Sequence, residues 1–118
     1  MREAGFYGGN YDPGVARRDF NTEDSVTPGE LLVQSAGFTA AVGFQNPVMV
    51  VTGTEDRPLC NRAVGSCEDI LNATGALFPD SRSYDYYAVP ETGHDVNLHY
   101  EAPKVMRKVH DWLDELSV

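Results

Sequence analysis

The chain has 118 residues, of which 42% are hydrophobic and 23% are charged, a composition typical of one globular domain with a modest core. Nine basic and eighteen acidic residues give a net charge of −9. This charge repels phosphate backbones and anionic lipid, and it disfavours nucleic-acid and membrane-surface partners. No apolar run approaches the roughly 20 residues that cross a bilayer, and nothing in these features assigns a compartment.

The first 26 residues are predicted to form a loop with at most one helical turn. They are rich in Gly, Asn, Asp and Tyr, and they contain the turn signal Asp12-Pro13-Gly14. They show no sustained period of 2 or 3.6 residues, so no longer element is expected there.

A helix is predicted to begin at Thr27, because Thr27-Pro28-Gly29-Glu30 is a capping-box pattern with Pro at the first helical position. An amphipathic stripe then recurs at three-to-four spacing and ends near Gly43. Its members are Leu31, Leu32, Ser35, Phe38, Thr39 and Val42.

Two strands are predicted further along the chain. Residues 48–51 form a short β-branched run between Pro47 and Gly53, and residues 84–89 form an aromatic run that ends at Pro90. Continuous apolar runs of this length are typical of strands buried on both faces of a parallel sheet.

A helix is predicted on each side of the second strand. The first runs from Asn61 to about Leu77, and the last begins at Pro103. The last helix carries one apolar stripe, which we expect to pack on the sheet. The stripe consists of Val105, Met106, Val109, Trp112, Leu113 and Leu116.

The order helix, strand, helix, strand, helix predicts an α/β fold with a parallel β-α-β unit. Two strands make a marginal sheet in water, and their edges leave hydrogen-bonding groups unpaired. The pattern therefore predicts that more sheet is supplied from elsewhere.

Two polar residues lie just beyond the predicted strand ends. Asp56 follows the first strand and His94 follows the second. Side chains at the carboxyl ends of neighbouring parallel strands gather at one edge of the sheet, where strands are about 4.8 Å apart. We therefore expect the Asp56 carboxylate to reach the Nδ1–H of His94, which is the orienting half of a catalytic triad.

At these positions the sequence resembles the α/β-hydrolase family, in particular its esterase-like fungal and bacterial members. Residues 47–56, PVMVVTGTED, are similar to the strand and loop that present the family's acid. Residues 93–100, GHDVNLHY, followed by Ala102-Pro103, are similar to its histidine loop and final helix. The chain order, acid before histidine, also agrees, and the resemblance covers roughly residues 45 to 116.

The resemblance implies a partial hydrolase fold, with residues 27–118 as the C-terminal part and residues 1–26 as a loop or remnant of a cap region. It also implies that Asp56 and His94 are the catalytic acid and histidine, that no cofactor or metal is needed, and that the substrate of the complete enzyme is a small-molecule ester. A missing N-terminal part of the fold, or a second copy of the chain, is the expected partner.

The family's nucleophile elbow, Gly-x-Ser-x-Gly, is absent from the sequence. Gly65-Ser66-Cys67 is the nearest approach, but it follows the acid strand and lacks the flanking glycines. The leading hypothesis is therefore a hydrolase segment that supplies acid and histidine to a serine from elsewhere. The alternative is a non-catalytic binding or assembly module derived from the same fold.

Other residues carry interpretations that stay open. Glu55 competes with Asp56 as the acid, and Cys60 and Cys67 are either a disulfide or, as the favoured interpretation, two half-buried thiols. A metal site of Asp56, His94, Asp95 and His99 is disfavoured because its spacing matches no established ligand motif. The remaining assignments are structural. Asp95 is assigned to the His94 loop or to the N-terminus of the following helix, and His99 to packing or hydrogen bonding. His110 is assigned to a solvated helix face, and Tyr84, Tyr86 and Tyr87 to strand packing.

Overall fold

The centre of the protein is a two-stranded parallel sheet formed by β1 (Val48–Gly53) and β2 (Tyr84–Val89). The structure is a computed structural model, and it describes residues 6–34, 39–60 and 63–116. The register pairs the strands from Val48 opposite Tyr84 to Gly53 opposite Val89. Both predicted strands and the mixed α/β character are therefore confirmed.

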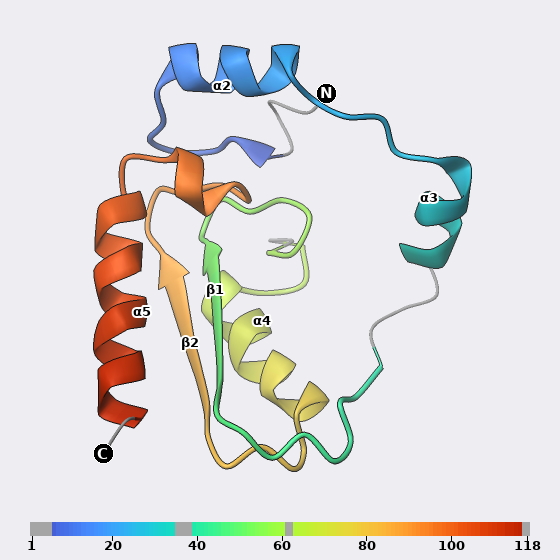
Figure 1. Cartoon of the computed structure of the whole chain (residues 1–118), viewed down its shortest axis with the longest axis vertical. Helices are drawn as coiled ribbons and strands as arrows, with labels where there is room; N and C mark the ends of the chain where they lie inside the picture. Colours follow the sequence, from blue (N-terminus) through green and yellow to red (C-terminus); the bar gives the residue numbers. More distant parts are fainter. Residues whose placement is uncertain (1–5, 35–38, 61–62, 117–118) are drawn as a thin grey trace.

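Helices surround this sheet unevenly, as Figure 1 shows: α4 and α5 run beside the strands, whereas α3 lies away from them. The helices and 3-10 turns in chain order are α2 (Pro13–Asn21), α3 (Pro28–Gln34), α4 (Cys67–Thr74), η1 (Gly75–Leu77), η2 (Val96–Leu98) and α5 (Ala102–Leu116). No helix within the described ranges has the length and apolarity needed to span a bilayer.

One face of the sheet packs against α4. Val50 and Ala88 contact a buried cluster made of Cys60, Cys67 and Leu71. The helix predicted from Asn61 to Leu77 begins later in the structure, because Ser66 caps α4 and residues 63–66 are not helical; positions 61 and 62 fall outside the described residues. A side chain with its own hydrogen bond to the helix N-terminus fixes where the helix begins.

The other face of the sheet is covered only in part by α5. Val105 is buried, but Met106, Leu113 and Leu116 are exposed, so the stripe does not pack on the sheet along its whole length. The half-buried Trp112 donates a hydrogen bond from Nε1 to Asp85 on β2, at 2.8 Å. This hydrogen bond ties the C-terminal half of α5 to β2.

The loop predicted for the first 26 residues is wrong in part, because α2 is a helix of nine residues. Asp12 is its N-cap and accepts a hydrogen bond from the Gly14 amide at 2.7 Å, while Pro13 occupies the first turn. Asp followed by Pro marks a turn and also starts a helix, and here it starts a helix.

The capping box predicted at Thr27 is confirmed at the start of α3. The Thr27 amide donates to Glu30 Oε2 at 2.7 Å, and the Glu30 amide donates to Thr27 Oγ at 3.2 Å. These hydrogen bonds hold the pKa of the Glu30 carboxyl below its ordinary value. The predicted continuation to Gly43 is not helical at residues 39–43, and positions 35–38 fall outside the described residues.

Replacing Trp112 tests how much of α5 belongs to the core. A Trp-to-Ala change in a packed core costs about 3 to 5 kcal/mol, and Trp112 is only half-buried. Trp112→Ala should therefore lower the free energy of unfolding by about 2 kcal/mol, roughly half that cost. Urea denaturation measures it, with the exposed Leu116→Ala as control, and loss of all soluble protein would contradict it.

Candidate active site at the strand ends

Asp56 is a completely buried carboxylate just beyond β1. Its Oδ1 accepts a hydrogen bond from the Leu59 amide at 2.9 Å, and its Oδ2 accepts one from the Thr52 hydroxyl. Oδ2 also lies 2.8 Å from Nδ1 of His94. A buried carboxylate is costly unless donors surround it, and these donors come from the strand, the turn and the neighbouring loop.

His94 follows β2 and turns its ring toward Asp56. Because a carboxylate only accepts hydrogen bonds, Nδ1 carries the proton and donates it to Asp56. In the neutral tautomer with this proton, Nε2 is the unprotonated nitrogen, which is the form a general base requires. The side chain is 32% exposed, and the Phe6 ring packs edge-on against it at a centroid distance of 5.0 Å.

Asp56 and His94 thus meet as their strand-end positions predict. The competition with Glu55 is resolved geometrically, since the carboxylate hydrogen-bonded to His94 belongs to Asp56. Glu55 instead donates its backbone amide to the Thr92 carbonyl at 2.9 Å. The contact alone does not assign a catalytic role to the pair.

Backbone contacts join the loop that carries Asp56 to the loop that carries His94. The Thr54 amide donates to the Val89 carbonyl at 2.9 Å. A Cβ on Gly53 would lie 1.8 Å from the Thr92 carbonyl oxygen, so this position accepts only glycine. The close approach sets the separation of the Asp56 and His94 loops.

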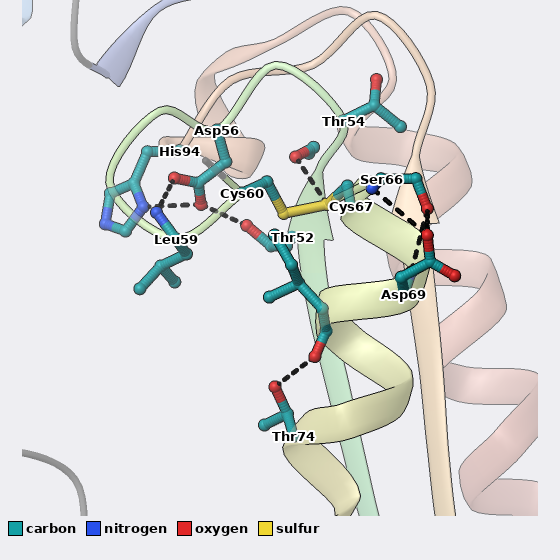
Figure 2. The surroundings of a disulfide bond; sticks show 12 residues. Thr52, Thr54, Asp56, Leu59, Cys60, Ser66, Cys67, Asp69, Thr74 and His94 are labelled. Atoms are coloured by element: carbon teal, nitrogen blue, oxygen red, sulfur yellow. Dashed lines mark hydrogen bonds and ion pairs between the residues drawn. A yellow bond between two sulfur atoms is a disulfide. The ribbon is translucent and has the colours of Figure 1, made fainter. Parts of the chain in front are cut away.

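A disulfide between Cys60 and Cys67 ties the turn that follows Asp56 to the first residue of α4 (Figure 2). The favoured interpretation of two free thiols is therefore wrong. Both cysteines are buried, and the Cys60 amide donates to the Asp56 carbonyl at 2.8 Å. The bridge thus restrains the turn that holds the acid.

Ser66, the nearest approach to a nucleophile elbow, is a helix cap. Its Oγ donates to Asp69 Oδ2 at 2.6 Å and accepts from the Asp69 amide at 3.1 Å. In Figure 2, Ser66 lies on the opposite side of the disulfide from His94. Its hydroxyl therefore has a structural function at the start of α4.

The other candidate residues have structural contacts. The hydroxyl of Tyr84 donates to the Leu71 carbonyl at 2.6 Å, and burial raises its pKa. His110 is exposed on α5, as expected. His99 is buried, and both of its ring nitrogens lie within hydrogen-bonding distance of backbone groups. Among the described residues, no group of three or more His, Cys, Asp or Glu side chains is placed to hold a metal ion.

An open pocket of about 620 Å³ lies against His94 on the α5 side of the sheet. Its apolar lining includes Val51 from β1 and Val105, Met106 and Val109 from α5. An external group can therefore approach the exposed part of the imidazole.

The chain matches no family model, no curated protein and no solved structure.

Removing the acid should destabilise the protein more than removing the histidine. Asp56→Ala leaves buried donors without an acceptor, at a cost of about 1 to 3 kcal/mol for each one that water cannot reach. His94→Ala should cost less, because water can replace the part-exposed ring. Thermal and urea unfolding compare the two, with Asp56→Asn as the volume-matched control, and a larger loss for His94→Ala would contradict the arrangement.

Opening the disulfide should loosen the acid turn. Closing a loop with a sequence separation of 7 residues stabilises a protein by about 2.5 kcal/mol in the chain-entropy treatment. Cys60→Ser with Cys67→Ser should lose about that much, measured by urea denaturation against the oxidised wild type. Reduced wild-type protein is the control, and stability unchanged in both would show that the bridge does not form.

Proposed function

We propose that this chain supplies the acid and the histidine of a Ser-Asp-His triad in an α/β-hydrolase-type carboxylic-ester hydrolase. The observation that carries the proposal is the 2.8 Å contact between Asp56 and Nδ1 of His94 at the carboxyl ends of two parallel strands. The resemblance of residues 47–56 and 93–100 to the family's acid and histidine loops supports the same assignment.

In the proposed reaction, Asp56 holds the His94 ring in the tautomer that leaves Nε2 unprotonated. His94 accepts the proton of a serine hydroxyl as the serine oxygen attacks the ester carbonyl carbon. His94 then gives this proton to the departing alcohol, and an acyl-serine remains. A water molecule attacks the acyl-serine in the same way, which releases the carboxylic acid and restores the serine.

The serine must come from another polypeptide segment, because no Gly-x-Ser-x-Gly occurs in the sequence and Ser66 caps α4. The sheet offers two unpaired outer edges among the described strands, and such edges are templates for further strands. Apolar side chains are exposed on α3 and α5, namely Leu31, Leu32, Val33, Met106, Leu113 and Leu116. These features support association with the remaining part of a hydrolase fold or with a second copy.

A second candidate function is a binding or assembly module without chemistry, and the missing elbow favours it. The reading frame upstream of Met1 distinguishes the two candidates. A strand, a Gly-x-Ser-x-Gly elbow and a helix encoded there would support the hydrolase. An upstream sequence without them would support the module.

Alone, the chain should hydrolyse short-chain nitrophenyl esters only at background rate and should not react with a fluorophosphonate serine probe. Together with an elbow-bearing segment it should do both. His94→Ala in the pair should reduce kcat by a factor on the order of 10⁶, the loss known for a triad histidine.

The matched control is His110→Ala, because His110 lies exposed on α5. This variant should retain the activity of the pair. Serine-dependent hydrolysis by the chain alone, or paired activity that is indifferent to His94→Ala, would overturn the proposal.

A further inference from the structure

Backbone groups on both sides of His94 meet at a second, buried imidazole, that of His99. Its Nδ1 lies 2.8 Å from the Asp95 carbonyl oxygen, and its Nε2 lies 3.0 Å from the Gly93 amide nitrogen. Gly93 and Asp95 are the residues immediately before and after His94. The His99 ring therefore closes the loop that presents His94.

We propose that His99 is a positioning residue, whose imidazole fixes the backbone that presents the His94 ring to Asp56. The catalytic role of His94 rests on the proposed function, whereas the contacts of His99 do not depend on it. His99 is 3% exposed, so water cannot replace either hydrogen bond at little cost.

The two contacts require a donor and an acceptor on one ring. The Asp95 carbonyl only accepts, so Nδ1 carries the proton, and the Gly93 amide only donates, so Nε2 is unprotonated. The Gly8 carbonyl oxygen also lies 3.0 Å from Nε2. The Gly8 carbonyl could accept a hydrogen bond only if Nε2 carried a proton, and Nε2 could then no longer accept from the Gly93 amide.

The same ring holds the N-terminal segment against the loop. Tyr7 stacks on His99 at a centroid distance of 5.6 Å, and Tyr11 contacts its edge at 5.7 Å. Bridges of β type join Gly9 to Thr92 and Tyr11 to His99.

The same N-terminal segment also contacts His94 directly, because Phe6 packs edge-on against the His94 ring. The Phe6 carbonyl also accepts from the Asp95 amide at 3.3 Å. A Cβ on Gly93 would lie 2.4 Å from the Phe6 carbonyl oxygen, so only glycine allows the segment to approach this closely. His99 thus acts on His94 from two directions, through the loop backbone and through Phe6.

The direct test is a nitrogen–nitrogen scalar coupling across the Gly93 N–H···Nε2 hydrogen bond in the ¹⁵N-labelled wild-type chain. The coupling is expected whenever Nε2 of His99 accepts the Gly93 hydrogen bond. A folded protein in which the Gly93 resonance is assigned and no coupling exists at any pH would overturn the proposal, whatever the variants do.

The second test follows the His94 Nδ1 proton, which should resonate far downfield because it is hydrogen-bonded to a buried carboxylate. His99→Phe keeps a ring beside Tyr7 but removes both hydrogen bonds, so this proton should exchange with water at least tenfold faster. His99→Gln offers a donor and an acceptor, and it should restore part of the protection. Asp56→Asn should abolish the signal, and His110→Phe should leave it unchanged.

A folded His99→Phe variant with the wild-type exchange rate would overturn the positioning role. In the reconstituted enzyme, His99→Phe should lower kcat with little change in KM, because it displaces the base and not the substrate. If the resonance responds as expected but no elbow-bearing partner gives hydrolysis, the positioning role stands and the proposed function fails.

Discussion

The arrangement of the loops depends on one constraint, a carboxylate that water does not reach. Asp56 is fully buried, and its oxygens are satisfied by Thr52 on β1, by the Leu59 amide in its own turn and by His94 from the adjacent loop. Buried polar groups without partners are strongly destabilising. The strand, the turn and the neighbouring loop must therefore be in place together, and the disulfide to α4 holds the turn in that position.

The strand register determines where the two loops leave the sheet. Gly53 lies opposite Val89 at the strand ends, so both loops leave the sheet at the same level. Gly53 lets the Thr92 carbonyl approach closely, and His99 then closes the second loop around its own backbone. A histidine presented by a short loop would otherwise sample many orientations, and ordering it in advance would remove that entropic cost from the proposed reaction.

Local patterns predicted the strands, the α3 capping box and the meeting of Asp56 with His94, because each depends on a short run of residues or on where parallel strands end. The α2 helix was missed because Asp12-Pro13 begins turns and helices alike. The spacing of Cys60 and Cys67 allowed both a bridge and two thiols. The contacts of His99 could not be predicted from the sequence, since they involve backbone groups of Gly8 and Gly93 that no side-chain pattern marks.

The hydrogen bonds of Asp56 are satisfied within the described residues, whereas the outer edges of the two-stranded sheet are unpaired there. This difference bears on the choice between the two candidate functions. An assembly module has no need of a buried carboxylate, and replacing a buried polar pair with apolar residues is often neutral or stabilising. Here the costly pair is present, and the partly exposed side chain of His94 lines an open pocket. Exposed apolar residues lie on α2, α3 and α5 and in the loops, and two of them, Leu59 and Met106, are next to the site. In the proposed divided hydrolase, a partner would cover these apolar side chains and leave the hydrogen bond between Asp56 and His94 in place.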